Sequence, residues 1–145
     1  MTTASALLLV DYREPEALRA LGTVDAQIEQ RWGCDYAMVR EGRVALAAQR
    51  KTVPDLLASR VDGRLYRQLR LLACAPVGVV VIEGHPHWAA GGSWADWPGH
   101  GPRWRRDEWW AALDAVQAAG VRLVEVADQA EIADWLRWQQ TQASR

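Results

Sequence analysis

The sequence predicts an α/β protein whose central sheet is covered by helices on both faces. Unbroken apolar runs at residues 6–10 and 77–82 are typical of strands buried on both faces of a sheet, and residues 121–126 form a further strand. Segments with helical spacing separate these runs, and this alternation indicates an α/β architecture. Residues 36–39 and 44–51 flank a Gly-containing turn, which predicts an early β-hairpin.

Start and stop signals predict the helices. Pro15 in a first turn and Gly22 at the stop bound a short helix. Thr52 as N-cap, with Pro54 in the first turn, begins another. Residues 28–32 show no such signal and are expected to be extended or irregular. The predicted helices are residues 15–21, a helix from Thr52 that ends before Gly63, and residues 64–73, 105–119 and 129–139.

Residues 85–102 are rich in Gly, Pro and Trp without any period, so we expect a long loop within the domain. Loops of this length in a compact domain are often functional or mobile. Tryptophans in or near this loop are expected to pack as core or lid, and the alternative is that they stack on bases. These residues are Trp88, Trp94, Trp97 and Trp104.

Composition bounds the class of protein. A chain of 145 residues, half of them hydrophobic and 24% charged, predicts a single globular domain over residues 1–145. No apolar run is long enough for a signal peptide or a membrane span, so we expect an intracellular, cytoplasmic protein that is nucleoid-associated if prokaryotic. Cys34 and Cys74 have no metal-ligand spacing and are expected to be reduced thiols.

Charge is unevenly distributed along the chain. Residues 40–70 hold eight basic and three acidic side chains, although the net charge of the whole chain is −1. Such a basic segment either steers a polyanion to one place or forms a solvated helix face. Charge alone leaves both interpretations open.

Lys51 is the only lysine among 17 basic residues, and an ammonium differs from a guanidinium because it is a compact charge with an adjustable pKa. In an extended strand Gln49 and Lys51 share one face with Ala45 and Ala47, which leave room for a ligand. With the carboxylate of Asp35 nearby, these residue types can form a metal-dependent phosphodiesterase site. The carboxylate and the amide oxygen would hold Mg²⁺ or Mn²⁺, and the lysine would stabilise developing negative charge.

Five sequence blocks in order resemble the nuclease domain of the XPF family of structure-specific DNA endonucleases. The resemblance is close over residues 7–84 and implies a restriction-endonuclease-like central mixed sheet. In that family the pattern is GD, then ERKxxxD, then a GRLxxQ helix. The matching blocks are Val10-Asp11-Tyr12-Arg13-Glu14, Cys34-Asp35-Tyr36, Gln49 to Asp55, Asp62 to Gln68, and Val80 to Gly84.

The resemblance implies a role for each matching residue. Lys51 is the expected catalytic lysine, and Asp35, Gln49 and Glu14 are the expected ligands of Mg²⁺ or Mn²⁺. Asp11 and Arg13 match residues that border the family's active site. Arg50 is expected to point away from Lys51. The expected DNA-binding residues are Arg64, Gln68, Arg67, Arg60 and Asp55.

Two residues depart from the family pattern. Cys34 replaces a glycine, and Gln49 replaces the glutamate of ERK. An amide oxygen still binds a hard cation but contributes no charge, so metal affinity is expected to fall. The departure leaves two readings open, an active nuclease and an impaired one.

The resemblance implies a Mg²⁺- or Mn²⁺-dependent DNA endonuclease that cleaves branched or flapped DNA in repair or recombination. The alternatives are a catalytically impaired DNA-binding or scaffolding module on a nuclease fold, and a related nuclease that acts on foreign DNA. Family members pair as dimers and carry helix-hairpin-helix motifs, which this sequence lacks up to Arg145. The expected partners are DNA, a second copy of this chain in a homodimer, and a targeting protein that supplies those motifs, with no membrane partner.

Overall fold

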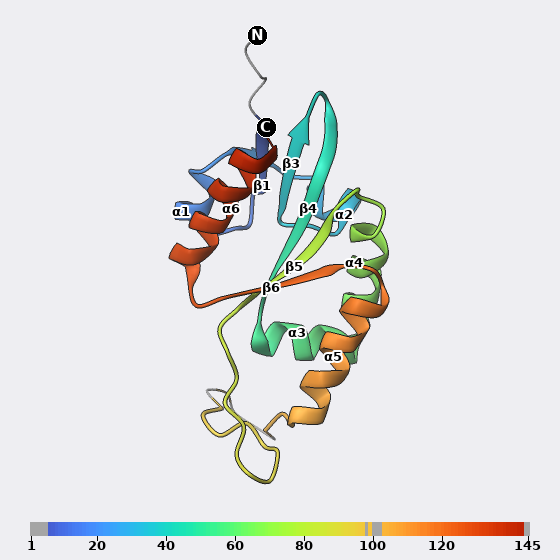
Figure 1. Ribbon diagram of the computed structural model, residues 1–145, viewed down its shortest axis with the longest axis vertical. Coiled ribbons are helices and arrows are strands. Elements are labelled where there is room, and N and C mark those ends of the chain that lie inside the picture. Colours follow the sequence, from blue (N-terminus) through green and yellow to red (C-terminus); the bar gives the residue numbers. More distant parts are fainter. Residues whose placement is uncertain (1–5, 98, 100–102, 144–145) are drawn as a thin grey trace.

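The structure is a computed structural model that describes residues 6–97, 99 and 103–143. Within this part of the chain the strands form one six-stranded mixed sheet in the order β2-β1-β3-β4-β5-β6 (Figure 1). This confirms the predicted α/β fold with an early hairpin. The strands are β1 (Leu7–Asp11), β2 (Thr23–Asp25), β3 (Tyr36–Arg40), β4 (Arg43–Thr52), β5 (Gly78–Glu83) and β6 (Arg122–Val126).

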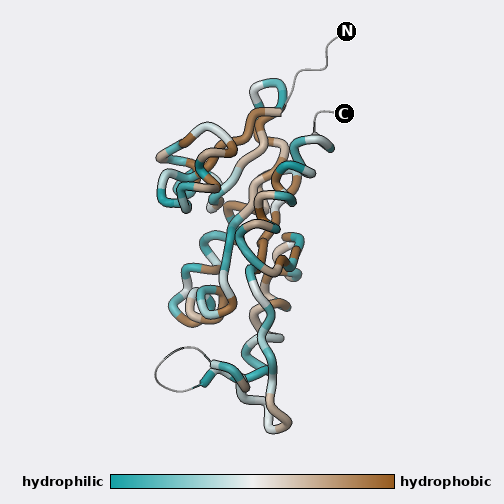
Figure 2. The backbone as a smooth tube through the Cα atoms, turned by 90° about the vertical axis from the view of Figure 1, so that its left-hand side faces the viewer, coloured by the Kyte–Doolittle hydropathy of each residue, from teal (hydrophilic) through white to brown (hydrophobic). Residues whose placement is uncertain are grey.

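Helices cover both faces of this sheet, as predicted. One face packs against α2 (Ile28–Trp32), α3 (Val53–Asp62), α4 (Arg64–Leu72) and α5 (Arg106–Ala118). The other face packs against α1 (Glu16–Arg19) and α6 (Gln129–Ala143). Figure 2 shows hydrophobic residues concentrated along the strands between these layers. No described helix is long and apolar enough to cross a membrane.

Strand directions bring the predicted site residues to one edge of the sheet. The antiparallel pairs β1–β3 and β3–β4 place the end of β1, the start of β3 and the end of β4 together. Parallel pairing of β4 with β5 adds Glu83, the partner of Thr52, to the same edge. Asp11, Asp35 and Lys51 are far apart in the sequence but therefore lie at one end of three neighbouring strands.

The prediction for residues 28–32 is wrong, because this segment is the helix α2. The Asp25 carboxylate accepts a hydrogen bond of 2.7 Å from the Gln27 backbone N–H just before the helix. Gly33, in the left-handed region at φ +63°, ends it. The short strand β2 was also missed, and it pairs in parallel with β1. Helix α1 ends at Arg19, earlier than the predicted residue 21.

The other helices and the loop agree with the predictions to within a few residues. Thr52 caps α3 by accepting a hydrogen bond of 3.2 Å from the Asp55 N–H. Between β5 and α5, the described residues of the long loop hold only isolated bridges, including Trp88 with Trp94. Trp94 is buried and packs against Trp88 and Trp97, as the core-or-lid prediction requires. Pro98, His100, Gly101 and Pro102 of the predicted loop lie outside the described residues.

Candidate active site

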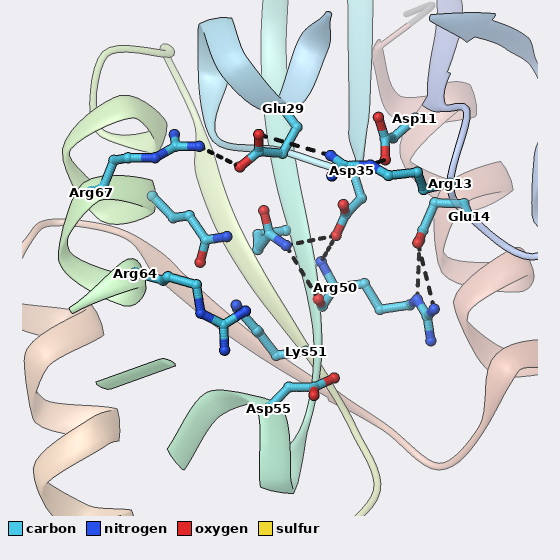
Figure 3. Close-up of a pocket in the computed structure, with 12 residues that line it drawn as sticks. Asp11, Arg13, Glu14, Glu29, Asp35, Arg50, Lys51, Asp55, Arg64 and Arg67 are labelled. Carbon is cyan, nitrogen blue, oxygen red and sulfur yellow. Dashed lines mark hydrogen bonds and ion pairs between the residues drawn. The ribbon is translucent and has the colours of Figure 1, made fainter. Parts of the chain in front are cut away.

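An open cavity of about 490 Å³ lies at the sheet edge where these strands end (Figure 3). It brings together every predicted site residue except Arg60, which lies in the last turn of α3. Glu29 and Arg50 line it in addition to the predicted set. The lining residues are Asp11, Arg13, Glu14, Glu29, Asp35, Gln49, Arg50, Lys51, Asp55, Arg64, Arg67 and Gln68.

Asp35 is held in place by backbone hydrogen bonds on both sides. Its N–H donates to the Ala48 carbonyl, and its carbonyl accepts from the Asp11 N–H, each at 2.8 Å. Oδ2 of its carboxylate accepts 2.8 Å hydrogen bonds from Gln49 Nε2 and from the Arg50 N–H. Burial raises the pKa of Asp35 to about 7, and the negative charge of Glu14 adds to this shift.

Gln49 is buried and joined to Asp35 through its amide nitrogen. Nε2 donates to Asp35 Oδ2 at 2.8 Å and makes a longer contact of 3.4 Å with the Arg50 carbonyl. Its Oε1 is buried and has no hydrogen-bond partner among the described residues. A buried unpartnered oxygen costs free energy, so its presence needs an explanation.

Lys51 points into the same cavity as Gln49, as strand alternation predicted. Its side chain is only 4% exposed. Burial lowers its pKa, and the charge of Arg64 lowers it further. Within the described chain its ammonium has no hydrogen bond or ion pair, although Asp35 and Asp55 act on it electrostatically. The cavity is therefore lined by a cation that has no ion-pair partner in the described structure.

Arg50 points away from Lys51, also as predicted, and joins a separate network. Its Nε contacts Glu14 Oε1 at 3.0 Å, and its Nη1 contacts Glu83 Oε1 at 3.4 Å. The Tyr36 hydroxyl donates to the same oxygen of Glu14. Glu14, a predicted metal ligand, thus has its carboxylate engaged by two side chains, while it still lines the cavity (Figure 3).

A chain of ion pairs crosses one rim of the cavity. Arg13 donates to Asp11 at 3.0 Å and lies 3.8 Å from Glu29, whose other oxygen accepts from Arg67 at 2.7 Å. Figure 3 shows this row of side chains. Glu29 was missed because its segment was predicted to be extended. The signal that could have found it is Asp25 before the helix and Gly33 after it.

The remaining predicted residues occupy the opposite side of the cavity. Arg64 is exposed and pairs with Asp62 at 2.7 Å. Gln68 is buried, and its Oε1 has no partner in the described structure. Asp55 lies in the first turn of α3, on the same side as Lys51 (Figure 3). Carboxylates, cations and unpartnered oxygens therefore face one space.

The residues present fit a divalent cation through oxygens of Gln49 and Asp35, which line the same cavity. Oε1 of Gln49 is buried without a hydrogen-bond partner among the described residues. Carboxylate and amide oxygens are the ligands that Mg²⁺ and Mn²⁺ prefer. Among the described residues no group of three or more acidic, histidine or cysteine side chains is placed to hold a metal ion, so the donor set carries little charge. The fit is that of a weak site.

Comparison with known proteins supports this interpretation of the fold. The sequence matches the family model of the ERCC4 domain over residues 10–137. The chain belongs to this family. Curated protein sequences give no match.

Solved structures give the same result for this ERCC4 domain. It is similar to XPF from Aeropyrum pernix, with a TM-score of 0.63 and 22% identity over 95% of this chain and 65% of that chain. A second structure, XPF from Aeropyrum pernix in complex with DNA, has a TM-score of 0.62 and 26% identity over 94% of this chain and 66% of that one. The ERCC4 domain described here thus spans just under two thirds of those chains, and its fold matches that of XPF.

Proposed function

We propose that this ERCC4 domain is a Mg²⁺- or Mn²⁺-dependent DNA endonuclease that cleaves phosphodiester bonds in branched or flapped DNA. One observation carries the proposal: the only lysine of the chain lies buried and unpaired in the same cavity as Asp35 and Gln49. The ammonium of a mostly buried lysine that has no ion pair within the described structure is available to a ligand of opposite charge. A phosphate group supplies the missing negative charge.

Each side chain has a role that its position supports. Lys51 stabilises negative charge that develops on the phosphate during attack, since it lines the cavity and has no ion pair with the described residues. Asp35 and Gln49 would hold the cation, which supplies Lewis-acid activation of the phosphate and of water. Arg64 and Arg67, on the α4 side, bind phosphates on either side of the reacting one.

The support for DNA as substrate comes from the site and from the family. The cavity holds five cations from three segments beside five carboxylates, so the cations would contact phosphates while the carboxylates at the strand ends serve a divalent cation. The structure of XPF from Aeropyrum pernix in complex with DNA adds that a protein similar to this chain binds DNA. Preference for branched DNA is the part of the proposal taken from the family alone.

A second candidate function is a DNA-binding module with little or no nuclease activity. The position of Gln49 favours it, because its amide N–H group donates to Asp35 Oδ2, an oxygen that a cation would otherwise contact. The side-chain amide of Gln49 would have to rotate by about half a turn before Oε1, in place of Nε2, faces Asp35. A glutamate at this position has no N–H group to donate to Asp35, and its carboxylate would add a negative charge to the cation site.

Cleavage of end-labelled flap, fork and linear DNA with Mg²⁺ and with Mn²⁺ tests the two candidates. The native chain is expected to cut branched DNA, and Lys51→Ala should lower the single-turnover rate by about 10²–10³-fold while DNA binding is retained. Gln49→Glu should tighten Mn²⁺ binding, which electron paramagnetic resonance measures without any cleavage. If only Gln49→Glu cuts DNA, the native chain is the binding module. If neither protein binds or cuts any of these DNAs, both proposals fail.

A further inference from the structure

A second open groove lies next to the candidate active site, between α2 and α4. Its volume is about 520 Å³, and it is lined by Gln30, Arg67, Arg70, Leu71 and Cys74. We call it the α2–α4 groove. Arg67 lines both this groove and the active-site cavity, so the two spaces meet at its side chain.

The groove has the chemistry of a nucleic-acid backbone site. Arg67 and Arg70 are three residues apart and thus lie on neighbouring positions of one side of α4. Arg70 is exposed, and its guanidinium has no ion pair or hydrogen bond to the described part of the chain. Leu71 is partly buried, lines the same groove and offers an apolar surface. Guanidinium groups bind phosphates, and the apolar floor suits a deoxyribose.

We propose that the α2–α4 groove holds the DNA backbone that flanks the phosphate in the candidate active site, so that one strand passes across Arg67. This rests on the proposed function, because the occupant is the same DNA. Continuity through a shared arginine and the positive charge of the groove favour DNA over a protein segment. Arg70, which the sequence blocks did not include, becomes a DNA-binding residue.

Cys74 offers a direct readout of the groove. It is exposed and lines the groove, whereas Cys34 is fully buried and burial raises the pKa of its thiol. N-ethylmaleimide at neutral pH should therefore modify Cys74 in the native chain. The rate is measured with and without saturating flap DNA in EDTA, where the DNA stays intact. Fluorescence anisotropy on the same samples reports how much DNA is bound. DNA is expected to slow the modification by about fivefold or more, as its backbone covers the thiol.

Arg70→Gln provides a second measurement, with Arg122→Gln as a matched control. Arg122 is an exposed arginine on β6, on the edge strand of the sheet. Arg70→Gln should weaken flap-DNA binding and lower the slope of log affinity against log salt by about one, whereas Arg122→Gln should leave both unchanged.

The outcomes separate the two proposals. If DNA binds but the modification rate of Cys74 stays the same, or if the two variants behave alike, the groove does not carry DNA, although the proposed function stands. A groove that docks a protein segment instead gives this same result. If no DNA binds to the native chain, the proposed function fails first.

Discussion

Strand β4 separates two polar clusters that lie at the same sheet edge and differ in how their charges are satisfied. On one face, Lys51 has no ion pair and Gln49 Oε1 has no hydrogen bond to the described residues. On the other face, Arg50 pairs with Glu14 and Glu83. The two clusters are distinct because alternate residues of a strand point to opposite faces, so Gln49 and Lys51 belong to one cluster and Arg50 to the other.

The comparison distinguishes a cluster completed by the fold from one that is left incomplete. In the Arg50 cluster, which consists of Arg50, Glu14 and Glu83, every charged group has an ion-pair partner. We therefore expect this cluster to contribute to stability. In the Lys51 cluster, which consists of Lys51, Gln49 and Asp35, burial lowers the pKa of the lysine and raises that of Asp35, and both shifts cost free energy in the folded protein near neutral pH. Groups that cost stability and share a cavity are typical of functional sites. Each prediction below tests this division.

The largest expected effect is on stability, from Arg50→Met and Lys51→Met. Arg50→Met leaves the buried Glu14 carboxylate without its cation, and should cost about 3 kcal/mol of unfolding free energy. Lys51→Met keeps about the same volume and removes an ammonium whose pKa burial and Arg64 lower and that has no ion pair within the described chain, so stability should be unchanged or higher. Urea denaturation at neutral pH measures both. Equal losses in the two variants would mean that the clusters do not differ as described.

A smaller effect is expected from pH, through Asp35. Its folded pKa of about 7 lies above the ordinary value of 3.8, so the folded protein holds this proton more tightly than the unfolded chain does. The stabilisation is complete below about pH 4 and is lost as pH rises through about 7. Between pH 5 and 7 the native chain should therefore lose about 2 kcal/mol relative to Asp35→Asn, which cannot titrate there. Urea denaturation of both proteins at the two pH values checks this, and parallel pH profiles would contradict it.

Much of this division could be predicted from the sequence, because it depends on local rules. Period-two alternation placed Gln49 and Lys51 on one face and Arg50 on the other, and the structure confirms this. The motif order located Asp35 and Asp11, and the strand directions then brought them to one edge. Thr52 was predicted as an N-cap from residue types alone.

The parts that could not be predicted depend on contacts between distant segments. Helix α2 has five residues, too few to show an apolar period, and its identity follows from the turn before it and Gly33 after it. Glu29 forms its ion pair with Arg67, which lies 38 positions away in the sequence. Arg60 was grouped with its basic neighbours, but the direction of α3 places it outside the cavity lining. Sequence spacing on one element cannot supply any of these contacts.

The smallest expected effect comes from Glu29, which joins the rim arginines and belongs to neither cluster. Its carboxylate pairs with both Arg13 and Arg67, so it reduces the positive charge that a DNA phosphate meets. Glu29→Gln should strengthen DNA binding by about threefold, since ion pairs with exposed arginines at a surface contribute about 1 kcal/mol or less. Asp114→Asn, the same charge change at an exposed site on α5, is the control. Anisotropy titrations with flap DNA measure both. Weaker binding by Glu29→Gln alone would show that this carboxylate positions the arginines for phosphate, and the rim would then belong with the Lys51 cluster as part of the substrate site.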